Sequence, residues 1–303
     1  MTEAKAFVPC HLTGIFQILD ESGSALHAGS KGAGVSLTHG LETLVTVKKA
    51  LKSSLLISIN GRTSNSATVS KHLMNIFLSR FEELRDSQIV IEHTVDVPIG
   101  AGFGTSGAAA LGLALALNKT FDLGLSSIEA AQLAHIAEIE CKTGLGTVIA
   151  EYFGGVEIRV KPGAPGIGEI RNIPVPKDVV VACLAFGSLS TQKFLTNPQT
   201  RRKTREIGGD LVNALMKDES VTNFMALSRQ FAEHLGLITR RIRMTLDATD
   251  EASLICSMPM FGESVFTLIE RKNLKSILEV FEKCKSKGRI IVSGVDQLGA
   301  RLL

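Results

Sequence analysis

Residues 98–118 join a glycine-rich loop, Pro-Ile-Gly-Ala-Gly-Phe-Gly-Thr-Ser-Gly, to a run of alanine and leucine typical of a buried helix. Glycine removes the Cβ atom where the backbone must turn sharply or approach a ligand closely. The first turn of a helix binds anions, usually phosphate, because its backbone N–H groups are free and its dipole is positive there. The stretch therefore predicts a phosphate-binding loop made by Pro98, Gly100, Gly102, Gly104, Thr105, Ser106 and Gly107.

Three known loop types do not fit these residues. A P-loop needs Gly-Lys followed by Ser or Thr, which occurs nowhere in the chain. Residues 102–107 match the dinucleotide pattern Gly-x-Gly-x-x-Gly, but the strand before them alternates, whereas that fold requires a fully apolar strand. A serine-hydrolase elbow needs Gly-x-Ser-x-Gly, and Ala108 stands at the last glycine. Glycines that only let a helix pack closely remain the alternative.

Composition excludes several classes of protein. The 303 residues are 45% hydrophobic and 21% charged with a net charge of +3, which does not indicate nucleic-acid binding. Five cysteines without a Cys-x-x-Cys pair argue against zinc or a disulfide framework. The longest apolar run, within 108–117, is too short to span a membrane. We expect a cytoplasmic protein with no membrane or nucleic-acid partner; the sequence leaves its oligomeric state open, with a homodimer as one option.

The elements around the loop predict a mixed α+β fold. Residues 88–98 alternate as a strand with one wet face, and 126–140 start with a capping box from Ser126 to Glu129. Residues 154–160 alternate again, which places Glu157 and Arg159 outward.

A segment rich in proline and glycine, 161–178, is the predicted domain junction. It divides the chain into domains at 1–165 and 175–303. For the second domain the pattern predicts these elements in order: a strand at 178–186, helices from 201 onward, a strand at 264–270, a helix at 273–286 and a strand at 288–295.

The loop sequence resembles the ATP loop of the GHMP kinases, a superfamily that includes galactokinase, homoserine kinase and mevalonate kinase. Three further stretches resemble this family in the expected order: Val-Pro-Cys-His at 8–11, residues 257–268 with Gly262, and the tail at 295–303. The resemblance implies an N-terminal domain like domain 2 of ribosomal protein S5 and a ferredoxin-like C-terminal domain. It also implies transfer of phosphate from ATP, with Gly262 on the ATP side.

Four strings are similar to the archaeal branch of this family that phosphorylates the terminal hydroxyl of pantoate for coenzyme A synthesis. They are residues 6–16, 29–34, 142–170 and 190–195. This resemblance implies that ATP and pantoate are the small-molecule partners. Two alternatives stay open: a kinase for mevalonate, homoserine or another hydroxy acid, and a relative that binds the nucleotide without catalysis.

The resemblance places the Mg²⁺ ligands at Ser106 and Glu138. Glu138 follows Ala131 and Ala134 on one small-residue stripe of its helix, so its carboxylate faces a neighbouring group. Magnesium needs one or two protein oxygens, because phosphates and water complete its shell. The competing ligand is Glu140. Ser106 also has the type expected of a helix N-cap.

Four residues are predicted to contact the substrate: Ser30, His135, Arg159 and His11, the last at a position where relatives often have lysine. Pantoate has a carboxylate, which a guanidinium holds well with two parallel hydrogen bonds. Each residue also has an ordinary alternative: a turn serine for Ser30, a structural histidine for His135 and a surface arginine for Arg159.

The chain departs from its better-known relatives at Thr147. In relatives with a catalytic aspartate, that residue lies seven positions before the Gly-Gly pair, here Gly154–Gly155. Threonine cannot accept a proton at neutral pH, so we predict that Thr147 orients the substrate hydroxyl. Phosphoryl transfer depends mainly on positioning and on neutralising charge, and the protein is still predicted to be an active kinase.

Overall fold

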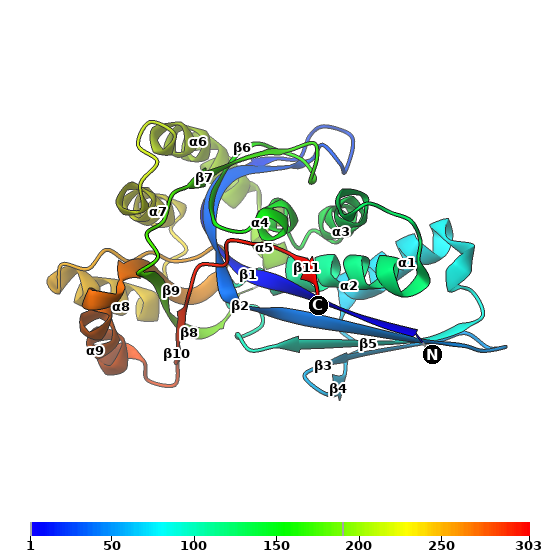
Figure 1. Cartoon of the computed structure of the whole chain (residues 1–303). Coiled ribbons are helices and arrows are strands. Elements are labelled where there is room, and N and C mark those ends of the chain that lie inside the picture. The colour runs from blue at the N-terminus through cyan, green and yellow to red at the C-terminus, as the bar shows by residue number, and fades with distance from the viewer. Residues whose placement is uncertain (1, 190) are drawn as a thin grey trace.

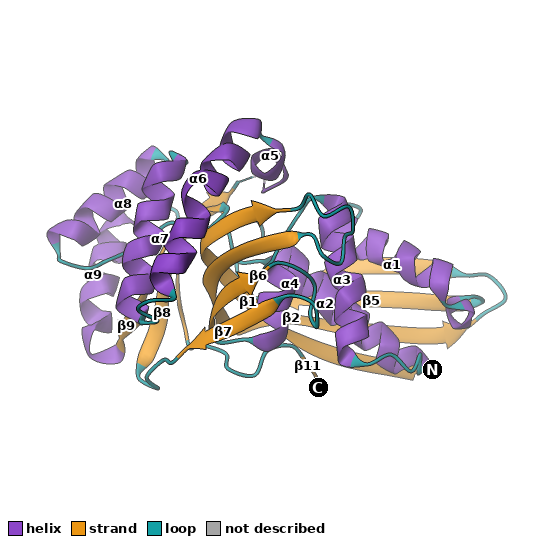
Figure 2. Ribbon diagram, turned by 90° about the horizontal axis from the view of Figure 1, so that it is seen from above, coloured by secondary structure: helices purple, strands orange, loops and turns teal. Residues whose placement is uncertain are grey.

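A computed structural model describes residues 2–189 and 191–303. Figure 1 shows a long, curved sheet with helices on one face, and a second layer of strands and helices at its far end. Figure 2, seen from above, shows α1, α2 and α3 together against the long sheet, with α6 to α9 gathered at the opposite end. The fold is α+β, as the sequence predicts. No helix of the described ranges is long and apolar enough to cross a membrane.

The long sheet has eight strands among the described residues, in the order β11-β1-β2-β5-β3-β4, with β6 paired to β2 and β7 to β6. Its strands are β1 (Thr2–Leu19), β2 (Gly29–Lys49), β3 (Ser54–Ile59), β4 (Arg62–Thr63), β5 (Ser87–Val95), β6 (Val156–Lys161), β7 (Glu169–Ile173) and β11 (Arg301–Leu302). Register shifts interrupt the β1–β2 pairing between Pro9 and His11 and between Thr13 and Ile15. Such bulges bend a strand and re-aim its side chains.

Helices α2 and α4 pack directly on this sheet, and α1 and α3 pack on α2 and on each other. They are α1 (Thr68–Arg80), followed by the 3₁₀ turn η1 (Glu82–Leu84), then α2 (Thr105–Phe121), α3 (Ser127–Cys141) and α4 (Thr147–Phe153). Helix α2 is buried from Gly107 to Leu117 except at Ala109, as its alanine- and leucine-rich composition predicts. The capping box is confirmed: Ser126 and Glu129 exchange side-chain and backbone hydrogen bonds at the start of α3.

The second sheet is antiparallel, in the order β10-β8-β9. Its strands are β8 (Val179–Ser188), β9 (Gly262–Glu270) and β10 (Arg289–Ser293), and the helices of this part of the chain are α5 (Thr191–Thr196), α6 (Pro198–Leu215), α7 (Val221–Leu235), α8 (Arg240–Glu251) and α9 (Leu274–Cys284), the last preceded by the 3₁₀ turn η2 (Arg271–Asn273). Helices α6 and α7 also pack on β1, and α7 packs on β9 as well, so α7 connects the two sheets.

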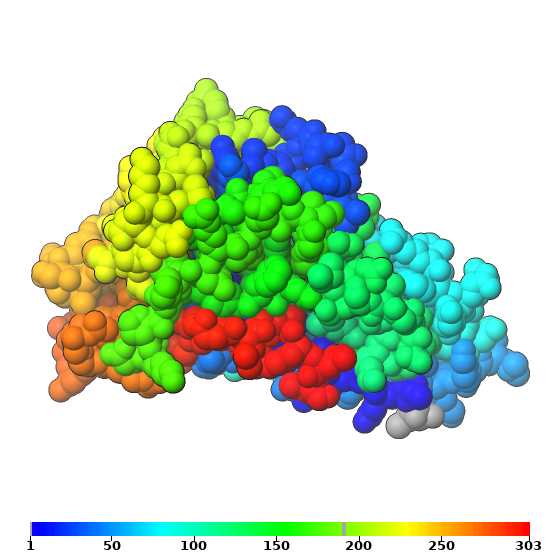
Figure 3. Space-filling view, turned by 45° about the horizontal axis from the view of Figure 1, so that its top comes forward, coloured from blue at the N-terminus to red at the C-terminus, as the bar shows by residue number. Residues whose placement is uncertain are grey.

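Two segments tie the C-terminal half to the first sheet. Strand β7 lies inside the predicted junction and pairs with β6. The tail returns to β1 through β11, and the backbone N–H of Ala300 donates to the carbonyl of Glu151 at 3.0 Å. Figure 3 shows this red tail lying against the green mid-chain segment. The division at 1–165 and 175–303, and the ferredoxin-like class of the second domain, stay predictions.

Alternation predicts the faces of β5 but not those of β6. On β5, the odd-numbered side chains such as Ile89 and Ile91 are buried and Glu92 is exposed, which confirms the prediction. On β6, the outward placement of Glu157 and Arg159 is wrong, because both side chains are buried. Both faces of β6 are covered, and a two-residue repeat cannot reveal what covers the second face.

Candidate functional site

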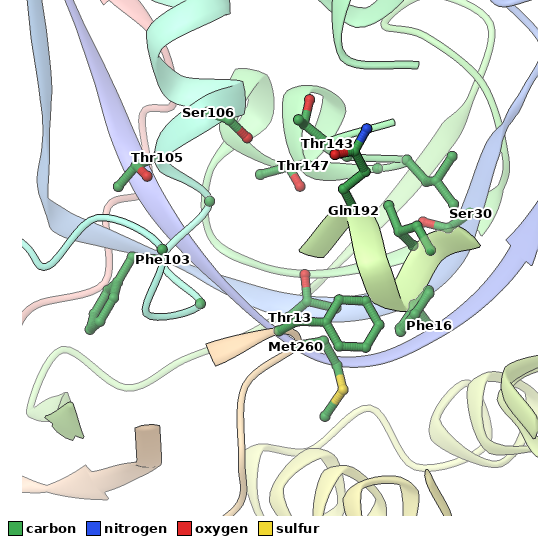
Figure 4. A pocket seen from close by; sticks show the side chains of 18 of the residues that line it. Thr13, Phe16, Ser30, Phe103, Thr105, Ser106, Thr143, Thr147, Gln192 and Met260 are labelled. Atoms are coloured by element: carbon green, nitrogen blue, oxygen red, sulfur yellow. The ribbon is translucent and has the colours of Figure 1, made fainter. Parts of the chain in front are cut away.

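A cavity of about 320 Å³ lies where the glycine-rich loop, the start of α4 and the two sheets meet. Figure 4 shows the side chains of Ser106, Thr143 and Thr147 on one side of it, with Phe16 and Met260 on another. The described lining residues are Thr13, Phe16, Ser30, Ile99, Gly100, Gly102, Phe103, Gly104, Thr105, Ser106, Thr143, Gly144, Leu145, Gly146, Thr147, Arg159, Gln192, Leu195, Met260 and Phe261. A mostly apolar pocket with a few converging polar groups is the usual form of a small-molecule site.

The glycine-rich loop leads into α2 with free backbone donors. Its N-cap is Gly104, which has φ +67° in the left-handed region and carries no side-chain cap. The prediction that Ser106 is the N-cap is therefore wrong, since Ser106 lies one residue inside the helix and lines the cavity. The first turn of α2 thus presents uncapped N–H groups beside a serine hydroxyl, which is an arrangement suited to phosphate.

Strand β9 of the second sheet packs against the glycine-rich loop. A Cβ atom on Gly262 would collide with the backbone of Ala101 and Gly102. The Ser264 hydroxyl donates to the carbonyl of Ala101 at 2.8 Å, and the backbone N–H of Leu189 donates to the carbonyl of Gly100 at 3.1 Å. Gly262 is thus in direct contact with the predicted phosphate loop, although it does not line the cavity itself.

Glu138 lies buried beside Ser106 and Thr143. The Thr143 hydroxyl donates to Oε1 of Glu138 at 2.6 Å, and Oε2 has no hydrogen-bond partner among the described residues. Burial raises the pKa of Glu138 to about 7, while the hydroxyls of Thr143 and Ser106 act in the opposite direction. A buried carboxylate oxygen without a partner, next to a serine hydroxyl, fits the hard oxygen ligands that Mg²⁺ prefers.

The competing carboxylate, Glu140, points elsewhere. Its side chain is about half exposed and pairs with His72 of α1 rather than with Lys142. Neither Glu138 nor Glu140 is among the described lining residues of the cavity, so their hydrogen-bond partners distinguish them. Glu138 and Glu140, two of the three glutamates of α3, therefore face different environments, and Glu138 is the one that lies beside Ser106 of the glycine-rich loop.

Arg159 lies deep in the cavity wall and is the one charged side chain among the described lining residues. It is about 1% exposed, and its Nη1 donates to Oε1 of Glu157, which is also buried. Burial lowers the pKa of Arg159, and the Glu157 carboxylate acts against that shift. Ser30 lies next to it, since a Cβ on Gly146 would contact both Ser30 Oγ and Arg159 Nε.

The two predicted histidines lie outside the described lining of the cavity. His135 is buried, and its Nε2 donates to the carbonyls of Ala25 at 3.1 Å and Ala28 at 3.0 Å. Burial lowers the pKa of His135 more than these two bonds raise it. His11 is buried against Glu157. Each of the two rings already has hydrogen-bond partners inside the protein. Contact of either ring with the substrate stays a prediction.

Thr147 is the first residue of α4 and lines the cavity. Its methyl group faces Gly104 and Gly107, and its hydroxyl lies toward Gly144. No aspartate or glutamate is among the described lining residues, so the pocket wall offers no exposed carboxylate as a general base. Thr147 thus lines the pocket at the position where the aspartate-containing relatives are expected to have their aspartate.

A second cavity of about 220 Å³ adjoins the first, and Ile99, Thr105, Ser106 and Thr143 line both. Its other walls are Leu41, Ile59, Ser66, Ala67, Thr68, Val69, Ser70, His93, Val95 and Ala109. His93 bonds to the hydroxyls of Thr43 and Ser70, and burial lowers its pKa to about 4, so the ring is neutral. This cavity is uncharged, in contrast to the first.

Sequence reasoning missed several residues of the site. Thr143 lies directly after the helix α3, in a string noted only as part of a resemblance, and its contact with Glu138 depends on the turn between α3 and α4. Thr13 lies between the two register shifts of β1 and Phe16 follows the second, and Gln192 and Leu195 come from α5. No local pattern marks these residues, because they reach the cavity through long-range packing.

Comparison with known proteins agrees with this geometry. Residues 64–155, which include the glycine-rich loop and α2 to α4, match the family model for the GHMP kinase N-terminal domain. The pantoate kinase of Methanocaldococcus jannaschii is 33% identical over 276 residues, which are 91% of this chain and 96% of the relative. The pantoate kinase of Thermococcus kodakarensis is 34% identical over 284 residues, 90% of this chain and 91% of the relative.

The fold is also similar to a solved structure described as a phosphotransferase related to the coenzyme A biosynthesis pathway. The two chains superpose with a TM-score of 0.88 at 28% identity, covering 99% of this chain and 98% of the other. The similarity therefore extends over both sheets and is not limited to the glycine-rich loop.

Proposed function

We propose how this chain, which belongs to the pantoate kinase family of the GHMP kinases, uses its two adjoining cavities to bind ATP and pantoate. The enzyme transfers a phosphoryl group from ATP to the terminal hydroxyl of pantoate and forms 4-phosphopantoate, a step of coenzyme A biosynthesis.

The observation that carries the substrate assignment is the combination of one buried arginine with apolar walls. Pantoate has a carboxylate, two methyl groups on its central carbon and a terminal hydroxyl. Arg159 supplies the cation for the carboxylate, and Phe16, Leu195 and Met260 supply an apolar surface for the methyl groups. The described lining has no carboxylate that would pair with the ammonium group of homoserine.

The second, uncharged cavity is assigned to the nucleoside of ATP. Ile59, Val69 and Val95 offer apolar contacts, and Ser66 and Thr68 offer hydroxyls for hydrogen bonding. Its shared residues Thr105 and Ser106 lie at the start of α2. A triphosphate that extends from this cavity would therefore cross the helix N-terminus and reach the cavity that holds the acid.

Ser106 and Glu138 would hold Mg²⁺, because their oxygens lie together and Oε2 of Glu138 lacks a partner in the described structure. When bound, the metal would neutralise phosphate charge. Thr143 holds Glu138 in place through its 2.6 Å hydrogen bond. Thr147 and Ser30 place hydroxyl groups in the cavity, where they can orient the hydroxyls of pantoate.

The remaining predictions concern the cell and the assembly. All five cysteines are free, which supports the proposed cytoplasmic location because the reducing cytosol keeps thiols unpaired. The proposed homodimer is testable by light scattering after size-exclusion chromatography, which would give twice the 32.4 kDa mass of the chain.

The function is tested by measuring ADP release with pantoate, mevalonate and homoserine in parallel, with ATP and Mg²⁺. We expect turnover with pantoate to exceed that with the other two. The Arg159→Lys variant should raise the KM for pantoate and leave the KM for ATP unchanged, because an ammonium cannot form two parallel bonds to a carboxylate. Equal or faster turnover of mevalonate or homoserine would contradict the assignment to pantoate.

A further inference from the structure

Four side chains form a continuous line of hydrogen bonds behind the cavity wall. The Thr13 hydroxyl bonds to Nδ1 of His11 at 3.2 Å, and Nε2 of His11 lies 3.0 Å from both carboxylate oxygens of Glu157. Glu157 in turn accepts from Nη1 of Arg159. The two ends of the line, Thr13 and Arg159, line the cavity, whereas His11 and Glu157 do not.

The hydrogen-bonded side chains of this line meet across strand β2 of the first sheet. His11 and Thr13 come from β1 and Glu157 and Arg159 from β6, and both strands flank β2. Gly34 pairs with both Thr13 and Glu157, and Gly32 pairs with Arg159.

Both glycines are needed for space. A Cβ on Gly34 would collide with the imidazole of His11, and one on Gly32 would collide with Nη2 of Arg159. The string at 29–34, noted from sequence only for its resemblance, therefore has a physical role: it clears the strip of β2 over which the charged side chains meet.

Hydrogen-bond chemistry sets the direction of the central bond of this line. An ionised Glu157 can only accept hydrogen bonds, so His11 donates its Nε2–H to it, and Nδ1 of the same ring bonds to the Thr13 hydroxyl. Arg159 is buried and needs a countercharge, and Glu157 is the carboxylate that contacts it. Arg159 and Glu157 therefore form a buried ion pair at one end of the line.

The pairing leaves one edge of the guanidinium available. Glu157 binds Nη1, whereas Nε, on the far side of the same group, is buried without a hydrogen-bond partner among the described residues. Nε lies beside Gly146 and Ser30, which both line the cavity. A carboxylate in the cavity can approach this edge and accept from Nε and Nη2 together.

We propose that Glu157, held by His11, is a positioning residue that orients Arg159 so that its Nε edge faces the carboxylate of the substrate. The inference rests on the proposed function, since it takes Arg159 as the group that binds the acid. Glu157 thereby sets the preference of the enzyme for an acid over a neutral analogue of the same shape, without touching the substrate.

The test compares pantoate with its primary amide, in which a carboxamide replaces the carboxylate. Glu157→Gln retains size and one acceptor oxygen but removes the charge and places an NH₂ group against donors. We expect the kcat/KM ratio of acid over amide to fall about tenfold or more, because Arg159 loses its fixed orientation. The KM for ATP should stay within about twofold of the parent value, since none of the four side chains lines the cavity assigned to the nucleoside.

Two further variants sharpen the test. Glu157→Asp keeps the charge and should restore the acid-over-amide ratio part of the way, and it serves alone if Glu157→Gln does not fold. Glu169→Gln is the matched control: this carboxylate lies exposed on the neighbouring strand β7, next to Lys161, and should change nothing.

The outcomes separate the two proposals. A parent enzyme that does not phosphorylate pantoate overturns the proposed function and this inference with it. An active parent whose acid-over-amide ratio is unchanged in Glu157→Gln and Glu157→Asp overturns only the positioning role. Equal losses with acid and amide would assign Glu157 to the stability of the fold and also contradict the proposal.

Discussion

The region around the first sheet buries eight histidine, acidic or arginine side chains, whereas the buried polar residues described between Val179 and Ser293 are all serine or threonine. These eight residues are His11, His93, His135, Glu138, Glu151, Glu157, Arg159 and Asp296, the last of which bonds to Ser36 of β2 through its backbone N–H. In the second part of the molecule, charges pair at the surface instead, as in the contacts of Glu233 with Arg229 and Arg243.

This difference separates the chemistry from its support. Burying charge is unfavourable unless it is paired or hydrogen-bonded, so buried ionisable groups with shifted pKa values tend to gather at functional sites. The second part of the chain contributes apolar walls such as Met260 and Phe261, and it braces the glycine-rich loop. The comparison predicts that substitutions around the first sheet change catalysis directly. Substitutions around the second sheet should act by moving the glycine-rich loop.

The largest effect is expected for Glu138→Ala. Loss of this carboxylate removes the proposed metal ligand and leaves charge on the transferring phosphoryl group less neutralised, so kcat should fall about a hundredfold to a thousandfold. ADP release measures the change, with Glu140→Ala as the matched control on the same helix, because Glu140 faces His72 instead. A near-normal Glu138→Ala beside an inactive Glu140→Ala would show that the metal ligand is Glu140.

A smaller effect is expected for Gly262→Ala in the second part of the molecule. The new Cβ would collide with the backbone of Ala101, so the glycine-rich loop must shift. We expect kcat/KM for ATP to fall about tenfold, since a misplaced binding loop lowers the rate without loss of a catalytic group. Gly187→Ala, where a Cβ would meet only Oε2 of Glu263 at 3.6 Å, should have normal kinetics. Normal ATP kinetics in Gly262→Ala would contradict the claim that β9 holds the glycine-rich loop in position.

The smallest effect concerns the pH dependence of stability, which should have opposite signs for a buried glutamate near the first sheet and a surface glutamate in the second part of the molecule. Neither carboxylate oxygen of Glu151 has a hydrogen-bond partner among the described residues, and burial with nearby Glu138 and Glu157 raises its pKa well above 4.5. The folded state thus favours the neutral acid, and its stabilising effect is complete below about 4.5 and is lost as pH rises. Glu151→Gln stays neutral, so its Tm relative to the parent should increase between pH 5 and 8.

Glu233 provides the opposite case. Hydrogen bonds from Arg243 and Arg229 lower its pKa, so its stabilising effect is present above 4.5 and is lost as pH falls. Glu233→Gln should therefore have a lower Tm than the parent at neutral pH and approach the parent at acid pH. Thermal unfolding from pH 4 to 8 checks both variants. A difference for Glu151→Gln that does not change with pH would mean that Glu151 is ionised in the fold.

Sequence reasoning found the parts of the site that local pattern encodes. The glycine-rich loop and the capping box of α3 are contiguous strings, and the small-residue stripe correctly placed Glu138 on a buried face of its helix. It failed for Glu157 and Arg159, because alternation cannot show that residues far away in the sequence, such as His11, cover the second face of β6. It also failed for the cap of α2, where Gly104 leaves Ser106 free to face the pocket.

The central claim is that pantoate binds with its carboxylate on Arg159 and its terminal hydroxyl toward the nucleotide. A crystal structure with pantoate, Mg²⁺ and a non-hydrolysable ATP analogue tests it most directly. The account predicts the carboxylate on the Nε edge of Arg159, the metal between Ser106 and Glu138, and the terminal hydroxyl near Thr147. A complex with the carboxylate away from Arg159, or with the triphosphate away from the start of α2, would contradict it.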